Sequence, residues 1–309
     1  MPRKLLFIVN PNAGKKIAAE ILHIIRKELP RNIYYQVVTW EDKDHFEEIA
    51  GQLLNDDYTD AIAVGGDGTV NAVARTILNS HIRLGIVPVG SGNGLARSLQ
   101  LSMNIREVIR QIVACRCMAI DYGTVNGQAF FCTAGLGFDA HIGQLFASSS
   151  ERGLKTYVKI TLRELLRYRA GKYLININGL VLKRKAFLIT VANAGQYGND
   201  FYIAPLADLQ DGLFHVVIFK KFPVYALPGL LIRFLTRKAH LSRFIETIST
   251  DRLEIICEKR GSIHFDGEPG SAGREVVFEI KKAALQVIVG DGFKLPLEKN
   301  RRVMQGAER

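Results

Sequence analysis

The sequence predicts an α/β domain with a doubly wound parallel sheet, followed by a mainly antiparallel β domain. Up to about residue 120, apolar strand-like runs alternate with segments of helical periodicity, which is typical of a parallel sheet covered by helices on both faces. After residues 121–123 the pattern changes to short alternating stretches separated by turns such as Asn126-Gly127 and Asn178-Gly179, which indicate hairpins.

A chain of 309 residues can form two ordinary domains, and the change of pattern places the boundary between them. We place the first domain at residues 1–122 and the second at residues 123–294. The C-terminal segment 295–309 is a candidate for packing back on the first domain. Because no glycine-serine linker separates the halves, we expect the two domains to pack together with the active site in the cleft between them.

The first half begins with two strand-helix pairs. Leu5–Val9 is predicted to be a strand that ends at Asn10, and the loop from Asn10 to Gly14 leads to a helix over Ile17–Leu29. A second strand over Tyr34–Val38 ends at Thr39, and a helix over Phe46–Leu54 follows.

Two glycine-rich loops then follow two apolar strands. The apolar run Ala61–Val64 ends in Gly65-Gly66-Asp67-Gly68-Thr69-Val70-Asn71, and Leu84–Val89 ends in Gly90-Ser91-Gly92-Asn93-Gly94. Glycine lets a backbone approach a ligand closely, and the free N–H groups at a helix start bind phosphate. Ligands of open α/β sheets bind beyond the carboxyl ends of the strands, where both loops should lie.

Asp67 has three interpretations at this stage. Beside a phosphate site its carboxylate would hold Mg²⁺ or accept a proton from an incoming hydroxyl. The structural alternative is that Asp67 or Thr69 caps the helix that follows.

The second half is predicted to be β-rich, with a helix over Lys155–Arg169 whose Leu162, Leu165 and Leu166 face the core. The segment 222–238 is apolar and ends in basic residues. By default it is a buried helix. The alternative is a membrane-docking element in which Arg233, Arg237 and Lys238 meet anionic head groups.

The charge balance points to an anionic partner. Lys and Arg total 41 against 30 Asp and Glu, a formal charge of +11. The chain has no arginine-rich tail and no nucleic-acid-binding module, which favours a membrane surface or ATP over nucleic acid. The four cysteines show no zinc-ligand spacing or disulfide framework and are interpreted as thiols of a reducing compartment. No apolar run is long enough to span a bilayer, and the N-terminus is too short for a secretory signal.

A set of ordered motifs resembles the diacylglycerol kinase catalytic-domain family, which includes sphingosine and ceramide kinases and is distantly related to NAD kinases. The motifs span residues 10 to 268: Asn10 to Lys15, Gly65 to Asn71, Pro88 to Asn93 with Ala96-Arg97, Gly135 to Ala140, Ala204-Pro205 through Asp211-Gly212, and Asp266-Gly267-Glu268.

The resemblance implies an NAD-kinase-like first domain, a β-sandwich second domain and transfer of the γ-phosphate of Mg-ATP to a lipid hydroxyl. Glu268 is then the general base, Asp266 supports it, and Asp67 is the rival for that role. Asp139 corresponds to a position near the lipid head group, and the loop from Asp208 to Leu213 to a structural Mg²⁺ site formed by the Asp211 carboxylate and the carbonyls of Asp208 and Leu213. The nucleotide-binding residues implied are Asn10, Gly14, Thr39, Gly65, Gly66, Asp67, Gly68, Thr69, Val70, Asn71, Gly90, Ser91, Asn93 and Asp121.

Two departures from the family pattern keep the acceptor open. Bacterial diacylglycerol kinases usually have an acid where this chain has Gly94, and a glutamate where it has Ala72. Diacylglycerol is the first expectation, and sphingosine or ceramide is the second. An NAD kinase is a further alternative, opposed by Asp266-Gly267-Glu268 and by Ala96-Arg97, and a catalytically inactive lipid-binding module is the last. As a lipid kinase the protein would be cytoplasmic and peripherally bound to the inner face of the membrane, and homodimer formation stays open.

Overall fold

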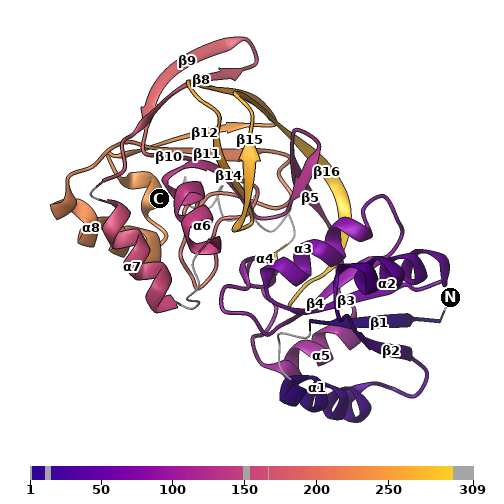
Figure 1. Ribbon diagram of the computed structural model, residues 1–309. Coiled ribbons are helices and arrows are strands. Elements are labelled where there is room, and N and C mark those ends of the chain that lie inside the picture. The colour runs from indigo at the N-terminus through magenta and orange to yellow at the C-terminus, as the bar shows by residue number, and fades with distance from the viewer. Residues whose placement is uncertain (1, 11–14, 149–153, 166, 295–309) are drawn as a thin grey trace, which may run out of the picture. The chain divides into compact units, whose positions relative to one another are not determined.

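The computed structural model describes residues 2–10, 15–148, 154–165 and 167–294 (Figure 1). The chain divides into two compact units: unit 1 is Met1–Ile120 with Ala283–Arg309, and unit 2 is Asp121–Lys282. The sequence-based boundaries differ from this division, because residues 121–122 belong to unit 2 and residues 283–294 to unit 1. Gly14 and the segment 295–309 lie outside the described residues.

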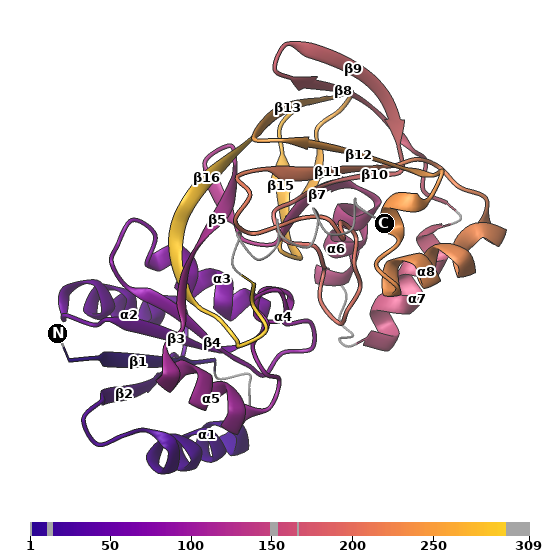
Figure 2. The same cartoon turned by 180° about the vertical axis from the view of Figure 1, so that it is seen from behind.

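Unit 1 contains a parallel sheet with helices on both faces. Its strands are β1 (Lys4–Val9), β2 (Tyr34–Thr39), β3 (Asp60–Gly65) and β4 (Arg83–Pro88), paired in the order β2-β1-β3-β4. Figures 1 and 2 show one pair of helices on one face, α1 (Lys15–Glu28) and α5 (Ile105–Ala114), and another pair on the other face, α2 (Lys43–Asn55) and α3 (Asp67–Thr76). This confirms the predicted doubly wound sheet.

Strand β3 explains why the apolar run of the sequence is continuous. All six of its residues are buried, since a central strand of a parallel sheet has helices over both faces and water over neither. The short helix α4 (Gly94–Ser98) follows β4 directly.

Unit 2 is built on two antiparallel sheets, as predicted. A six-stranded sheet has the order β12 (Ile245–Thr250), β11 (Phe214–Phe219), β10 (Leu188–Ala192), β7 (Thr133–Gly137), β14 (Gly261–Phe265), β15 (Glu268–Ala272). The second sheet of unit 2 is the antiparallel part of a ten-stranded sheet that also includes the parallel strands of unit 1. Its strands are the last part of β5 (Cys117–Val125), β6 (Gln128–Phe130), β8 (Gly171–Ile177), β9 (Leu180–Ala186), β13 (Arg252–Cys257) and the first part of β16 (Glu275–Ile288).

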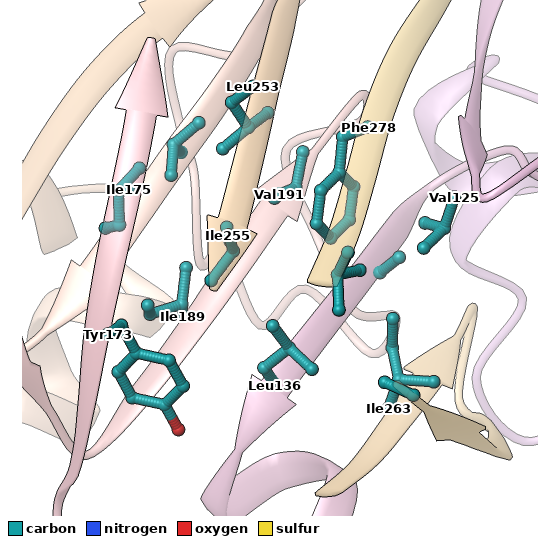
Figure 3. Packing of buried hydrophobic residues seen from close by; sticks show 14 of the residues in the cluster. Val125, Leu136, Tyr173, Ile175, Ile189, Val191, Leu253, Ile255, Ile263 and Phe278 are labelled. Carbon is teal, nitrogen blue, oxygen red and sulfur yellow. The ribbon is translucent and has the colours of Figure 1, made fainter. Parts of the chain in front are cut away.

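The two sheets share one apolar core and form a β-sandwich. Figure 3 shows Leu136, Ile189 and Ile263 of the six-stranded sheet packed with Ile175 and Phe278 of the second sheet. All five side chains are at most 2% exposed. The two-residue turns at Asn126-Gly127 and Asn178-Gly179 have positive φ at both residues, as type I′ hairpins require.

Helices cover the other face of the six-stranded sheet. Along β10, Ile189 and Val191 face the sandwich core, whereas Leu188 and Ala192 lie in a second cluster with residues of the helices. These helices are α6 (Phe138–Ala147), α7 (Leu154–Leu165) and α8 (Leu227–Leu235), with 3₁₀ turns η2 (Val224–Ala226) and η3 (Ala239–Leu241) near α8. Because both faces of the sheet are buried, its central strands are apolar at nearly every position.

The helices of unit 2 differ from the prediction of one helix over Lys155–Arg169. Helix α7 ends at Leu165, and its Leu162 is 54% exposed instead of facing the core. Leu165 packs against the second cluster as predicted, and Leu166 lies outside the described residues. Helix α6 was not predicted, because its short apolar sequence follows β7 with no turn residue other than Gly137.

None of the described helices is long and apolar enough to cross a membrane. The four cysteines are free thiols.

Candidate active site

Unit 1 collects the predicted nucleotide-binding residues at one edge of its sheet. The parallel register pairs Val9 with Thr39 and Val64, and Gly65 with Pro88. The residues that end or follow these strands therefore lie at the same carboxyl edge, and Asn10 is held there because its N–H donates to the Val64 carbonyl (3.0 Å). This is the edge at which open α/β sheets bind ligands.

The two glycine-rich loops touch through their backbones. The Val89 N–H donates to the Gly65 carbonyl over 3.1 Å. A Cβ atom added to Gly90 would lie 2.4 Å from the Gly66 Cα, and one added to Gly66 would lie 3.2 Å from the Gly90 Cα. Glycine is required at Gly90 because the neighbouring atom is backbone and cannot move aside as a side chain would.

Asp67 joins the same two loops. It is the first residue of α3, whose N-cap residue Gly66 makes no side-chain capping bond. The Asp67 carboxylate instead accepts the backbone N–H groups of Asn93 (3.0 Å) and Gly94 (2.7 Å). The interpretation of Asp67 as the helix cap was therefore wrong. Burial raises the pKa of Asp67, although the hydrogen bonds from Gly94 and Asn93 oppose that rise.

Two amide side chains add further hydrogen bonds to the loops. The Asn10 Nδ2 donates to the Thr69 hydroxyl over 2.8 Å. The Asn93 side chain accepts the Gly90 N–H (3.1 Å) and donates to the Gly90 carbonyl (2.8 Å), while its own backbone is left-handed with φ 54°.

The remaining residues of the predicted site differ in exposure. Thr39, Gly68 and Ser91 are exposed, whereas Val70 is buried in the core. Asn71 is 3% exposed, and its Nδ2 has no hydrogen-bond partner among the described residues. A buried donor without a partner is costly unless a ligand accepts from it.

These features fit the phosphates of a nucleotide. The start of α3 follows the first glycine loop, the glycines leave room for an oxyanion beside the backbone, and Asn71 offers a further hydrogen-bond donor.

In unit 2, Asp266 and Glu268 belong to a tight hairpin but have different environments. Asp266 (φ 51°) and Gly267 (φ 86°) form the turn between β14 and β15. The Asp266 carboxylate accepts three backbone N–H groups, at 2.7–2.8 Å, from Phe131, Cys132 and Thr133. Glu268 begins β15 and is partly exposed. Asp266 therefore fixes the turn that carries Glu268.

Asp121 lies in unit 2 and holds the loop predicted to bind Mg²⁺. Its carboxylate accepts the Gly212 N–H (2.7 Å), and its own N–H donates to the Leu209 carbonyl (2.7 Å). In the same loop the Asp211 carboxylate accepts the Leu213 N–H (2.9 Å), and Asp208 accepts the Gln210 N–H (3.1 Å). Across the described part of the chain, no three His, Cys, Asp or Glu side chains gather as a metal site.

Asp139 is the centre of a polar cluster on the helix side of the six-stranded sheet. Its Oδ2 lies 2.9 Å from His264 Nε2, 3.0 Å from the Tyr197 hydroxyl and 3.3 Å from the Thr190 hydroxyl. Gly135 makes room for the pair, since a Cβ there would lie within 2.7 Å of both Asp139 and His264.

Sequence reasoning missed His264, Tyr197 and Thr190. His264 is 4% exposed, and its Nδ1 has no partner among the described residues. One signal was present: Thr190 is a polar residue inside the apolar run Leu188–Ala192, and His264 lies between two apolar residues just before the Asp266 turn.

Comparison with known proteins agrees with this arrangement. Residues 4–125 match the model of the diacylglycerol kinase catalytic domain, and residues 132–289 match that of the YegS C-terminal NAD kinase beta sandwich-like domain. A protein of Pectobacterium atrosepticum named "Probable lipid kinase YegS-like" is 29% identical over 282 residues, which cover 88% of this chain and 91% of that protein. A protein of the same name from Klebsiella pneumoniae is 26% identical over 92% of this chain and 95% of its own length.

Solved structures share the fold. A diacylglycerol kinase from Bacillus anthracis superposes with a TM-score of 0.73 at 20% identity, covering 94% of this chain and 97% of its own. An NAD kinase from Archaeoglobus fulgidus, solved with ATP, superposes with a TM-score of 0.55 at 11% identity, covering 93% and 94%. The expectation of an NAD-kinase-like first domain and a β-sandwich second domain is confirmed. From its two matching domain models and its curated relatives, the chain belongs to the diacylglycerol kinase catalytic-domain family of lipid kinases.

Proposed function

We propose that this lipid kinase transfers the γ-phosphate of ATP to the free hydroxyl of diacylglycerol and so forms phosphatidic acid. The observation that carries the nucleotide half of the proposal is the clamp made by Asp67 on Asn93 and Gly94. It holds two glycine-rich loops against each other beside the start of α3. Phosphoryl transfer depends on such positioning of the phosphates more than on covalent chemistry by the protein.

Glu268 is the proposed general base. The lipid hydroxyl oxygen forms a bond to the γ-phosphorus as the bond to the β,γ-bridging oxygen breaks, ADP leaves, and the hydroxyl proton moves to the Glu268 carboxylate. Asp266 is less suited, because three backbone N–H groups already occupy its carboxylate oxygens. Asp67 likewise accepts two backbone N–H groups, which favours a positioning role for it.

Mg²⁺ would neutralise charge on the phosphate oxygens when bound. A separate, structural Mg²⁺ would be held by the loop from Asp208 to Leu213, whose Asp208 carbonyl, Asp211 carboxylate and Leu213 carbonyl offer the oxygen ligands that suit this cation. The absence of a three-carboxylate cluster in the described ranges is compatible with Mg²⁺, since this ion commonly uses one or two carboxylates together with substrate phosphates and water.

A sphingoid base or ceramide is the second candidate acceptor, and Gly94 is the observation that favours it. In this chain the backbone N–H of Gly94 donates to the Asp67 carboxylate. No second carboxylate stands at this position, where bacterial diacylglycerol kinases of the family usually have one.

The experiment that tests the function measures transfer of labelled phosphate from ATP in mixed micelles. Diacylglycerol, sphingosine, ceramide and phosphatidylglycerol are offered separately, and NAD is offered in solution. Labelled phosphatidic acid made by the wild type and not by Asp67→Asn would support the proposal. A labelled sphingolipid alone would replace diacylglycerol by the second candidate, and labelled NADP or no product would overturn the proposal.

A pair of variants separates the two carboxylates of the turn. Glu268→Gln should lower kcat by about 100-fold or more, as expected for loss of a general base, and leave the melting temperature unchanged. Asp266→Asn should lower the melting temperature as well, because an amide cannot accept all three N–H groups. Wild-type kcat in Glu268→Gln would exclude this residue as the base.

A further inference from the structure

Unit 2 exposes an unusual apolar surface around α8. We use the term α8 surface for these side chains: Val224, Tyr225, Leu231, Ile232, Leu235, Leu241, Arg233, Lys238 and Arg243. Tyr225 is 79% exposed, Ile232 61%, Leu241 60% and Leu235 58%. Figures 1 and 2 show α8 at the margin of unit 2, outside the sheets. Monomeric proteins rarely gather so much exposed apolar area without a binding partner.

Helix α8 does not need these side chains for folding. Its Leu230 and Phe234 are 3% and 5% exposed and lie in the second core cluster, where the Phe234 ring is 4.6 Å from that of Phe201. Leu231 and Leu235 are one turn apart on another side of the helix and remain exposed. In an ordinary surface helix that side would carry polar residues.

The charge around α8 has one sign. No Asp or Glu occurs between Asp211 and Glu246, whereas the same stretch contains Lys220, Lys221, Arg233, Arg237, Lys238 and Arg243. Two of these form an ion pair or a hydrogen bond within the protein, and the exposed Arg243 guanidinium lies over the neighbouring Phe244 ring, 4.8 Å from its centre. Lys220 pairs with Glu246 at 3.4 Å, and Arg237 stacks 4.2 Å from the Tyr202 ring centre and donates to its hydroxyl over 2.5 Å.

Arg233, Lys238 and Arg243 remain for an external anion. None of the three forms an ion pair with a described residue, and Lys238 and Arg243 are exposed. Because Arg237 contacts Tyr202 and Arg243 makes no hydrogen bond or ion pair with a described side chain, we choose Arg243 as the third basic residue of this surface.

We propose that the α8 surface docks the protein on an anionic lipid bilayer. The apolar side chains enter the interface between head groups and acyl chains, and the three basic side chains lie at the level of the lipid phosphates. A second copy of the chain fits less well, because a two-fold interface places the same surface on itself and would bring these unpaired cations together. The inference rests on the proposed function in that it explains how a kinase reaches an acceptor held in a bilayer.

Vesicle sedimentation tests the proposal. Wild-type protein should bind vesicles of phosphatidylcholine with phosphatidylglycerol more tightly than vesicles of phosphatidylcholine alone. Ile232→Gln with Leu235→Gln should weaken binding to the mixed vesicles by about tenfold or more. Arg233→Ala with Lys238→Ala and Arg243→Ala should remove the preference for the anionic vesicles.

Matched controls come from unit 1. Leu54 in α2 is 50% exposed among acidic neighbours, and Arg31 is an exposed cation in a turn. Leu54→Gln and Arg31→Ala should bind both vesicles as the wild type does. Melting temperatures of all variants should match, because none of the replaced side chains is buried.

The proposal is overturned if both sets of α8 variants bind vesicles as tightly as the wild type does. It is also overturned if the wild type is a dimer and the α8 variants become monomers while their vesicle binding is unchanged, because the surface would then be a contact between two copies of the chain. Transfer to a short-chain diacylglycerol dissolved without vesicles tests the enzyme separately. The α8 variants should keep that activity, and its absence in the wild type would count against the proposed function alone.

Discussion

At the scale of single residues, Asp60 shows how unit 1 stabilises the end of its sheet opposite the glycine loops. It is the first residue of β3 and is fully buried. Arg3 contacts its carboxylate through two nitrogens at 3.1 Å, Arg83 through two at 2.7 and 2.8 Å, and the Thr59 hydroxyl at 2.6 Å. A buried carboxylate is tolerated when its acceptor positions are filled in this way.

The first prediction concerns Asp60→Asn. The variant leaves the Arg3 and Arg83 guanidinium groups beside a neutral amide, so unit 1 should lose about 3 kcal/mol of stability at pH 7. Urea unfolding followed by the fluorescence of Trp40, the single tryptophan, measures this loss, because Trp40 packs 4.5 Å from Phe46 of α2 in unit 1.

The pH dependence of that loss has a definite sign. Burial alone would raise the pKa of Asp60, but the hydrogen bonds from Arg3, Arg83 and Thr59 outweigh it and hold the pKa below its usual value. The contribution of Asp60 is therefore complete above about pH 4 and is lost as pH falls through the lower pKa of the folded state. The difference in stability between wild type and Asp60→Asn should shrink as the pH falls below about 4, and an equal difference at every pH would contradict this account.

The roles of buried polar residues such as these could hardly be predicted from the sequence. Asp60, His264 and Tyr197 acquire their roles from partners that are distant in the chain, such as Arg3 and Asp139. Neither the periodicity of the sequence nor a local motif indicates which distant residues come into contact.

At the scale of elements, the contact between the two glycine loops leads to the second prediction. Gly90→Ala would place a methyl group 2.4 Å from the Gly66 Cα. The loops must then separate, which should cost about 1 to 3 kcal/mol of stability and raise the KM for ATP by about tenfold. Steady-state kinetics and Trp40-monitored unfolding measure both effects.

Gly51→Ala is the matched control. Gly51 lies inside α2, and a Cβ there would meet no atom within 4 Å. Alanine should stabilise the helix by up to about 1 kcal/mol and leave the KM unchanged. If Gly90→Ala behaved like Gly51→Ala, the close approach of the loops would not matter for nucleotide binding.

The elements were predictable where the signal was local. The strands before the glycine loops and the hairpins at Asn126-Gly127 and Asn178-Gly179 follow from apolar runs and turn residues. Helix α6 was harder, since it follows its strand directly. The helix expected by default within 222–238 is present as α8, but it is only partly buried, because Leu231, Ile232 and Leu235 are exposed.

At the scale of the whole molecule, strand β16 links the two units. Its first part pairs with β13 in unit 2, and its Val287 pairs with Leu84 of unit 1. The boundary falls between Lys282 and Ala283, and Ala283 has a φ of 47° within the strand. The family motifs and the change of pattern near residue 121 located one crossing of the chain between units, but the return crossing inside a continuous strand has no sequence signal.

The third prediction uses this left-handed residue. The left-handed conformation costs a non-glycine residue about 1 to 2 kcal/mol, so Ala283 lowers the free energy of unfolding at the point where the chain returns to unit 1. Ala283→Gly should remove that cost and, after the larger entropy of the unfolded glycine, stabilise the protein by about 0.5 to 1 kcal/mol.

The neighbouring Ala284 provides the comparison, because it is exposed in the same strand and is not among the residues with positive φ. Ala284→Gly should destabilise the protein by about 0.5 to 1 kcal/mol, as glycine does inside a strand. Urea unfolding followed by Trp40 fluorescence and by circular dichroism measures unit 1 and the whole chain in parallel. Opposite signs for the two substitutions would show that the strain lies at the junction itself, whereas equal destabilisation would show that Ala283 is relaxed and that the bend of β16 costs nothing.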